Sequence, residues 1–116
     1  MELAIDYGRK RIGIATVFFS SIINNKGWKK VVPQIEKIIE QKSIDTLVFG
    51  LPLNVDGTES IMSAEVREFA RRFNIKKEFI DERYTSLEAL ELHNKEFIDD
   101  ISAKIILERY KSKQFL

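Results

Sequence analysis

The sequence predicts an α/β fold built on a mixed five-stranded sheet, and three observations support this class. Three short β-rich segments near the N-terminus are separated by tight turns, which is typical of an antiparallel meander. Two later apolar segments alternate with amphipathic helical patterns, which is typical of parallel strands joined by crossover helices. Two further helical patterns complete the chain, and no internal repeat interrupts this order.

The three N-terminal strands are each bounded by turn residues. The first is expected over residues 1–5 and ends at Asp6-Tyr7-Gly8. A turn at Gly8–Arg11 leads into a β-rich run over residues 12–19. A third short strand over residues 21–23 precedes a turn rich in asparagine and glycine. Together these segments predict an antiparallel meander.

The central part of the chain alternates helix and strand. Apolar residues recur at helical spacing from Trp28 to Ile39. Pro33 is compatible with a helix only in the first turn, so we expect this helix to start near Val31. Residues 46–49 form a continuous apolar run, typical of a strand buried on both faces, which ends at Gly50-Leu51-Pro52.

The C-terminal half predicts one more strand and three helices. Helices are expected over about residues 60–73, over residues 85–94 behind a Thr85–Glu88 capping box, and from Asp99 or Asp100 to Lys111. A short strand over residues 78–80 ends at Asp81-Glu82-Arg83. Four aromatic residues are expected in the core: Phe49, Phe69, Phe73 and Phe79.

The composition favours a single soluble domain over residues 1–116 and excludes several chemistries. The chain has 116 residues, within the usual domain size, and no cysteine, which excludes disulfides, thiol nucleophiles and zinc–thiolate sites. His93 is the only histidine and is expected on a helix surface, so a serine–histidine triad is unsupported. The apolar runs fall short of the ~20 residues that span a bilayer, and a strand starting at Glu2 leaves no room for a signal peptide. We therefore expect a cytoplasmic protein that does not bind membranes.

The net charge of +1 conceals an uneven distribution. Residues 1–30 carry six basic and two acidic groups, whereas residues 31–66 carry two basic and six acidic groups. The overall balance argues against a nucleic-acid binder, but the local cluster around Arg9, Lys10 and Arg11 argues for one, because attraction to phosphate is local and screened. The same turn could serve only to keep the protein soluble. Charge therefore leaves nucleic-acid binding undecided.

Carboxylates lie at two strand ends and at the start of the last helix, close to where α/β folds bind ligands. Asp6 ends the first strand, Asp81 and Glu82 end the last, and ligand sites lie outside the carboxyl ends of parallel strands. Asp99 shares a helix face with Ala103, Ile106 and Tyr110 and so points toward the sheet. Convergence of these groups would suit two hard cations ~3.5–4 Å apart that act on a phosphodiester.

Each carboxylate also has a purely structural interpretation. Asp6 could be a turn former, because aspartate is favoured at strand exits. Asp99 could be a helix N-cap, and Asp81-Glu82-Arg83 could be a solvated loop with an ion pair. The residues alone leave these alternatives open.

Four motifs in order resemble the YqgF/RuvX family of pre-16S rRNA nucleases, also called Holliday junction resolvase-like proteins. The first is Asp6-Tyr7-Gly8-Arg9-Lys10-Arg11-Ile12-Gly13, and the second is the segment Gly50-Leu51-Pro52-Leu53-Asn54-Val55-Asp56-Gly57-Thr58. The third is Asp81-Glu82-Arg83-Tyr84-Thr85-Ser86, and the fourth is Asp99 with the Ser102–Leu107 helix that follows it. The motifs span nearly the whole chain.

The resemblance implies a three-layer RNase H-like fold, a magnesium or manganese site with two metals, and hydrolysis of phosphodiester bonds in 5′-end maturation of pre-16S ribosomal RNA. It implies that Asp6, Glu82 and Asp99 are catalytic metal ligands, with Asp81 as the other candidate for the second acidic position. Six residues are implied as nucleic-acid contacts or as the rim of the site: Arg9, Lys10, Arg11, Arg83, Asn54 and Thr58. The protein is expected to be a monomer or homodimer.

The chain departs from the family pattern in two loops. The segment Phe18-Phe19-Ser20-Ser21 is short and lacks an acidic residue that many members have, and only Lys95–Ile98 connect the third helix to Asp99. These changes bear on substrate range more than on metal chemistry. Two alternatives therefore stay open: a junction-resolving nuclease acting on branched DNA, and a catalytically silent RNA-binding or transcription-associated module. The Asp6-Tyr7-Gly8 hairpin also resembles the phosphate-binding turn of actin-like ATPases. Those proteins need two such lobes around the nucleotide, and this chain has the length for only one.

Overall fold

The computed structural model describes residues 1–82 and 98–114. Five strands form one sheet of order β3-β2-β1-β4-β5, with β1 antiparallel to β2 and parallel to β4. The elements are β1 (Glu2–Asp6), β2 (Arg11–Ala15), β3 (Ser20–Asn24), α1 (Trp28–Gln41), β4 (Thr46–Leu51), α2 (Ile61–Ala70), β5 (Lys76–Asp81) and α4 (Ile98–Gln114). This confirms the predicted mixed sheet with its antiparallel first three strands.

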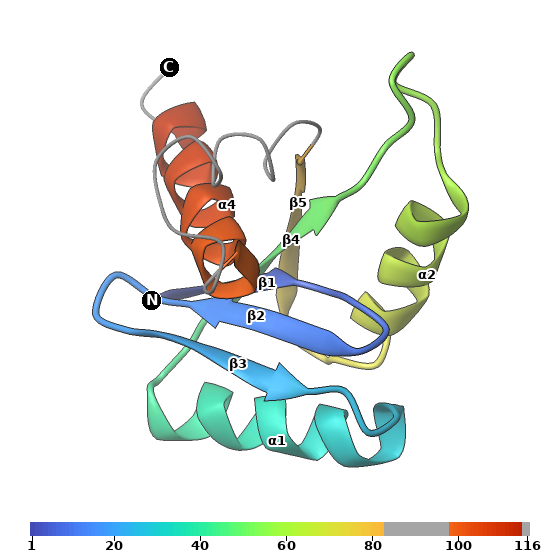
Figure 1. Cartoon of the computed structure of the whole chain (residues 1–116). Coiled ribbons are helices and arrows are strands. Elements are labelled where there is room, and N and C mark those ends of the chain that lie inside the picture. The colour runs from blue at the N-terminus through green and yellow to red at the C-terminus, as the bar shows by residue number, and fades with distance from the viewer. Residues whose placement is uncertain (83–97, 115–116) are drawn as a thin grey trace.

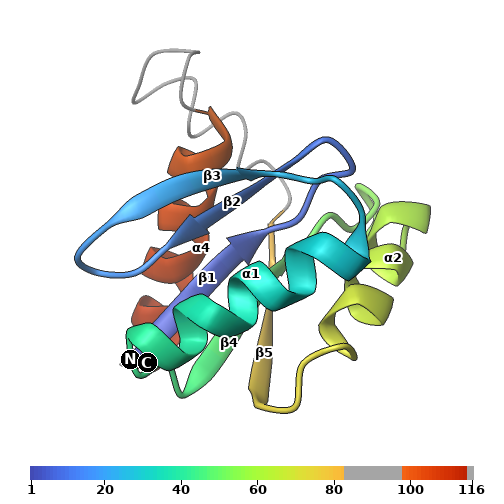
Figure 2. The same cartoon turned by 90° about the horizontal axis from the view of Figure 1, so that it is seen from below.

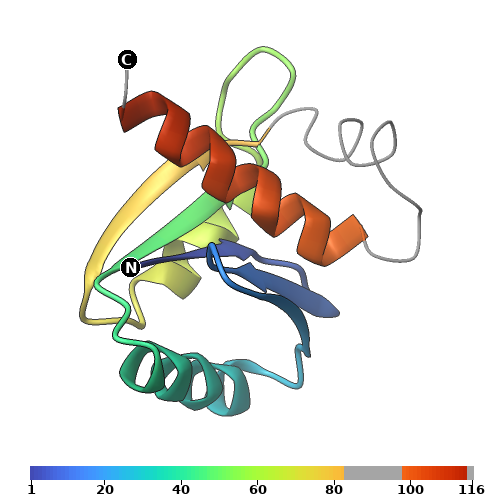
Figure 3. The same cartoon turned by 90° about the vertical axis from the view of Figure 1, so that its left-hand side faces the viewer.

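The sheet lies between two helical layers (Figures 1 and 2). Helices α1 and α2 cover one face, and α4 crosses the other face, where it packs on β1 and β2 (Figure 3). Helices on both faces of a mixed sheet are the arrangement expected of an RNase H-like fold. None of the described helices is both long enough and apolar enough to cross a bilayer.

The larger core lies between the sheet and the α1/α2 layer. Successive side chains of β1 point to opposite faces of the sheet. Leu3 and Ile5 therefore face the α1/α2 layer, and Ala4 between them faces α4. Phe69 of α2 is fully buried and its ring contacts those of Phe49 and Phe73. The four aromatic residues expected in the core all lie in this cluster, with Phe79 on its partly buried edge.

The second, smaller core lies under α4. Helix α4 contributes Ile106, Leu107 and Tyr110, which pack on Ala4 of β1 and Val48 of β4. The small side chain at Ala4 lets α4 approach β1 closely, in line with the interdigitation of large and small residues in packed cores. Helix α4 is thereby held across the middle of the sheet.

The second strand is shorter than predicted. The sequence predicts β structure over residues 12–19, but β2 ends at Ala15. The hydroxyl of Thr16 accepts hydrogen bonds from the backbone N–H groups of Phe18 and Phe19 at 3.1 and 3.3 Å, and these bonds close a turn. A threonine side chain competes here with strand pairing, which β-propensity alone does not reveal.

The first helix starts earlier than predicted. It begins at Trp28, so Pro33 lies beyond the first turn and the expected start near Val31 was wrong. The Trp28 ring packs on Phe69 with 5.5 Å between ring centroids, and its indole N–H donates to the Tyr7 hydroxyl at 3.0 Å. This anchoring of the helix start outweighs the cost of a proline inside the helix.

Three sequence predictions fall on residues 83–97, outside the described part of the chain. They are the helix behind the Thr85–Glu88 capping box, the surface position of His93, and the role of Arg83.

Candidate active site

The carboxyl ends of the central strands meet at one edge of the sheet. Asp6 is the last residue of β1, and β4 and β5 run parallel to it with Leu51 opposite Asp81. The backbone N–H of Glu82 donates to the Leu51 carbonyl at 3.1 Å, which continues the pairing one residue beyond β5. Glu82 is therefore fixed next to the exit of the central strands.

The side chains of Asp6 and Glu82 meet at this edge through a hydrogen bond. Burial raises the pKa of Glu82 to about 9, and the nearby Asp6 carboxylate contributes through its charge and through the hydrogen bond. The Arg109 guanidinium acts in the opposite direction and lowers the pKa of Glu82. The Glu82 carboxyl is thus held against the Asp6 carboxylate in a largely buried place, where the ionised form of Glu82 is disfavoured.

A glycine in β4 makes room for this pair. A Cβ atom on Gly50 would lie 2.8 Å from Oε2 of Glu82 and 2.5 Å from Cδ1 of Ile106. Both distances are shorter than nonbonded contacts allow. Gly50 therefore lets the Glu82 carboxyl lie directly against the β4 backbone, under α4.

Gly50→Ala is expected to displace the Glu82 carboxyl. The methyl group collides with the mobile ends of two side chains, so the fold should survive at a cost of about 1–3 kcal/mol. In the metal-ligand role that the family resemblance implies for Glu82, a displacement of about 1 Å should lower phosphodiester cleavage by about a hundredfold. Urea unfolding and a cleavage assay measure the two effects separately. Wild-type cleavage by a folded Gly50→Ala protein would contradict this account of the glycine.

Asp81 and Arg109 complete this edge of the sheet. The Arg109 guanidinium, on α4, donates through Nη1 to the Asp81 carbonyl at 2.9 Å. Asp81 and Glu82 are adjacent in an extended segment, so their side chains leave the backbone on opposite sides, and Glu82 is the one brought against Asp6 and Gly50. Arg109 was missed in the sequence, because its closeness to Glu82 depends on how α4 crosses the sheet.

Asp99 lies in the first turn of α4. Three members of the predicted inward stripe, Ala103, Ile106 and Tyr110, are confirmed as buried, and the inward direction of the Asp99 side chain stays a prediction. The same helix crosses β1, the strand that carries Asp6. Among the side chains that the structure describes, which exclude that of Asp99, no group of three metal-ligating residues is found.

The turn after Asp6 is held by a network that sequence reasoning missed. The Tyr7 hydroxyl donates to Oε2 of Glu65 at 2.7 Å, and Arg9 pairs with Oε1 of the same carboxylate at 2.9 Å. Glu65 lies on α2, more than fifty residues away in the chain. Arg9 thus enters an ion pair within the protein, whereas Lys10 and Arg11 have exposed side chains on the turn.

The Glu65 network should make stability depend on pH. The hydrogen bond from Arg9, followed by that from Tyr7, lowers the pKa of Glu65. The stabilisation is therefore present above the unfolded-state pKa and is lost as pH falls through the lower folded-state value. We expect Glu65→Gln to lower the free energy of unfolding by about 1 kcal/mol at pH 7 and less at pH 3. The control is Glu36→Gln on the exposed face of α1, and equal pH profiles for the two variants would contradict the prediction.

The loop after β4 is shaped by its own polar side chains. The Asn54 amide donates to the Thr58 hydroxyl at 3.0 Å, and the Thr58 hydroxyl donates to Asp56 at 2.6 Å. Asn54 and Thr58 thus order the loop after β4, and because β4 runs parallel to β1, this loop leaves the sheet at the same edge as Asp6. Their predicted place at the rim of the site agrees with this position, and their role in binding stays a prediction.

The donor set at this edge suits a hard divalent cation. Asp6 and Glu82 offer only carboxylate oxygens, the donors that Mg²⁺ and Mn²⁺ prefer. A bound cation would take the place of the proton that the raised pKa keeps on Glu82, and it would offset the negative charge of both carboxylates. The residues present therefore fit the metal ion that the sequence motifs imply.

The whole chain is similar to one protein family. Residues 1–113 match the family model described as "RuvX: Holliday junction resolvase". Similar proteins named "Putative pre-16S rRNA nuclease" include one from Crocosphaera subtropica, 33% identical over 93% of this chain and 90% of its own length, and one from Saccharophagus degradans, 35% identical with the same coverage. A third, from Pseudomonas putida, is 41% identical over 75% of this chain and 70% of its own. Because the family model matches residues 1–113 of the 116 and relatives 33–35% identical cover most of the chain, the chain belongs to the RuvX family.

Proposed function

We propose that this protein is a divalent-metal-dependent nuclease that hydrolyses phosphodiester bonds in the 5′-end maturation of pre-16S ribosomal RNA, in the cytoplasm. The observation that carries the proposal is the pairing of the Asp6 and Glu82 side chains at the carboxyl edge of the sheet. Similar proteins that share most of this chain's length are named as nucleases for that precursor, which supports the choice of substrate.

The proposed roles divide between carboxylates and cations. Asp6, Glu82 and Asp99 would hold Mg²⁺ or Mn²⁺, with Asp81 as the other candidate ligand. When bound, the ions supply charge neutralisation at the phosphate and activation of water. Lys10 and Arg11, exposed on the turn after Asp6, would hold the phosphate backbone together with Arg9 and Arg83. Gly50 keeps the Glu82 carboxyl in place, and Arg109 offsets part of its negative charge.

A second candidate function keeps the site and changes the substrate. The matched family model is described as a Holliday junction resolvase, which favours branched DNA. Resolution of a junction requires two active sites related by symmetry, so this function needs a dimer. A monomer in light scattering at the assay concentration would argue against it.

The test compares substrates under one set of conditions. Purified protein is incubated with a pre-16S ribosomal RNA fragment and with a four-way DNA junction, each with Mg²⁺, with Mn²⁺ and with EDTA. We expect cleavage of the RNA that EDTA abolishes. Preferential cleavage of the junction would establish the second candidate, and binding of RNA without cleavage of either substrate would establish a catalytically silent RNA-binding module.

Metal binding should also be visible without substrate. At a concentration ten times the dissociation constant, Mn²⁺ should stabilise the folded protein by about 1.4 kcal/mol, which raises the melting temperature by about 6 °C. Glu82→Gln removes one negative ligand and should abolish the rise. Glu36→Gln, on the far side of the sheet, is the matched control and should keep it. An equal rise in both variants would place the bound ion elsewhere.

A further inference from the structure

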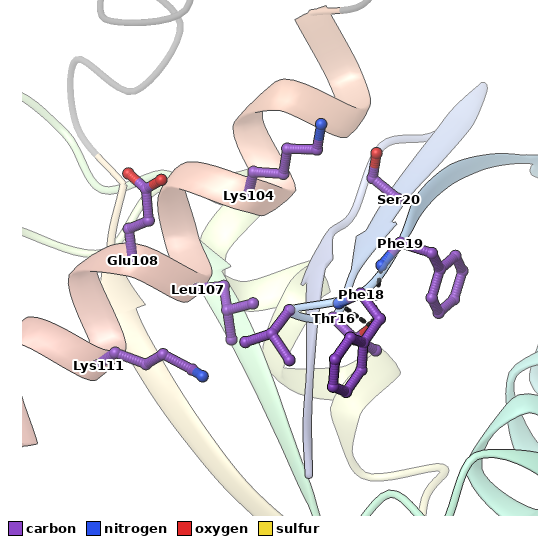
Figure 4. Close-up of a pocket in the computed structure, with 9 residues that line it drawn as sticks. Thr16, Phe18, Phe19, Ser20, Lys104, Leu107, Glu108 and Lys111 are labelled. Carbon is purple, nitrogen blue, oxygen red and sulfur yellow. Dashed lines mark hydrogen bonds between the residues drawn. The ribbon is translucent and has the colours of Figure 1, made fainter.

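A second surface feature lies between the β2–β3 turn and α4, away from the carboxylates. Figure 4 shows a pocket of about 360 Å³ with the turn residues on one wall and α4 on the other. The turn contributes Thr16, Phe18 and Ser20, and the helix contributes Lys104 and Lys111. Neither set belongs to the site described above, and the short turn was singled out in the sequence without a role.

Phe18 is presented to solvent by a fixed turn. Phe18 is 81% exposed and the adjacent Val17 is 52% exposed, so the tip of the turn presents an apolar patch of two neighbouring residues, as contact surfaces do. The Thr16 hydroxyl accepts from the backbone N–H of Phe18 at 3.1 Å, and the Thr16 N–H donates to the Phe19 carbonyl at 2.8 Å. Phe19 turns to the opposite side, where Lys42 covers its ring at 4.4 Å. The turn therefore holds one aromatic ring inward and displays the other.

Positive charge lies across the pocket from this ring. Lys104 and Lys111 stand two turns apart on α4, and Figure 4 shows Lys111 directed toward the Phe18 side of the pocket. The carboxylate of Glu108, between them, is directed away from Phe18 (Figure 4). Lys111 pairs with Glu2 only at 3.8 Å, so a phosphate can compete for its ammonium group. The Lys104 side chain is directed toward Ser20 at the other end of the pocket (Figure 4). An exposed ring with one ammonium group near it and a second further along the helix suits a nucleic-acid base and its flanking phosphates.

We propose that this pocket is a subsite for single-stranded RNA, in which a base stacks on Phe18 and adjacent phosphates contact Lys104 and Lys111. The proposal rests on the proposed nuclease function. Its position supports it, because α4 leads from Asp99 in its first turn to Lys104 about 8 Å along the axis and to Lys111 about 18 Å along it. A strand that leaves the carboxylate edge along α4 reaches the pocket within a few nucleotides.

The aromatic half of the subsite is tested by RNA binding without catalysis. The probe is a fluorescently labelled single-stranded RNA of twelve uridines (~12 nucleotides covers the site sizes of such grooves), titrated in EDTA and followed by anisotropy. Phe18→Ala should weaken binding by about tenfold, since stacking on an aromatic side chain contributes that much per base. Phe18→Tyr keeps a stacking ring and should bind within about twofold of wild type. Equal affinities for wild type and Phe18→Ala would overturn the proposal.

The cationic half is tested by salt dependence. Each phosphate contact on a single strand contributes about 0.7 to the slope of log affinity against log salt, so the double variant Lys104→Ala/Lys111→Ala should lower the slope by about 1.4. The control is Lys37→Ala, an exposed lysine on α1 at the opposite face of the sheet, which should leave the slope unchanged. Equal slopes for the double variant and the control would overturn the proposal.

These measurements separate the subsite from the catalytic proposal. Stacking and salt effects as expected, with no cleavage in Mg²⁺ or Mn²⁺, would support the subsite and refute the nuclease function. Cleavage with unchanged binding in the pocket variants would refute the subsite alone. Self-association that Phe18→Ala abolishes would show that a second copy of the chain covers the pocket, and this result would also overturn the proposal.

Discussion

Asp6→Asn should reduce phosphodiester cleavage by about a thousandfold, the largest effect on activity expected for a single substitution in this protein. Asparagine keeps the size and shape of the side chain but removes the negative charge that a hard cation requires. Asp6 lies on the central strand and is hydrogen-bonded to Glu82, so the loss removes one half of the carboxylate pair. Cleavage of the pre-16S ribosomal RNA fragment in Mg²⁺ measures the effect.

Two controls make this result specific. Asp45→Asn removes the same charge from an exposed aspartate just before β4, at the opposite edge of the sheet, where it pairs with the N-terminal amine at 2.7 Å. This variant should cleave at the wild-type rate. Asp6→Asn should stay folded, with a free energy of unfolding within about 1–2 kcal/mol of wild type, because the asparagine oxygen can still accept a hydrogen bond from the Glu82 carboxyl. A folded Asp6→Asn protein with wild-type cleavage would refute the proposed metal site.

Phe69→Ala should produce the largest loss of stability, about 3–5 kcal/mol. The Phe69 ring is fully buried and lies 4.8 Å from the Tyr7 ring and 5.5 Å from the Trp28 ring, measured between centroids. Alanine leaves a cavity where α1, α2 and the exit of β1 meet, and the surrounding elements cannot fill it. Because Tyr7 follows Asp6, this cavity also loosens support for the catalytic edge.

The matched control for this prediction is Phe18→Ala, which deletes the same side chain from an exposed position. Its free energy of unfolding in urea should stay within about 0.5 kcal/mol of wild type, as for most surface substitutions. The midpoint of Phe69→Ala should shift strongly to lower urea. Similar urea midpoints for the two variants would show that burial of the Phe69 ring does not contribute the expected stability.

Local patterns in the sequence predict most of the fold. The apolar run at residues 46–49 predicts a strand buried on both faces, and every residue of β4 is buried. The helical stripe through Ala103, Ile106 and Tyr110 predicts a buried face of α4, and all three residues are buried. Both predictions succeed because burial on a given face is set by spacing along the chain, which the sequence contains directly.

Local patterns fail where a distant contact outweighs a local preference. Pro33 predicts a later start for α1, but the packing of Trp28 on Phe69 and its hydrogen bond to Tyr7 fix the start earlier. The β-rich run after Ile12 predicts a longer strand, but the Thr16 hydroxyl closes a turn. Neither result follows from the preference of the residues involved, because each depends on a partner placed by the rest of the fold.

The fold class and the family follow from local patterns along the chain, and the same patterns predict the three acidic positions, because strand exits, helix faces and motifs are properties of neighbouring residues. Which of the described groups meet depends on the tertiary structure. It placed Glu82 against Asp6, with Gly50 making the space, and it paired Arg9 with Glu65 across more than fifty residues. It also set Phe18 opposite the lysines of α4. These contacts depend on how the helices pack on the sheet, and that packing is set by side chains that lie far apart in the sequence.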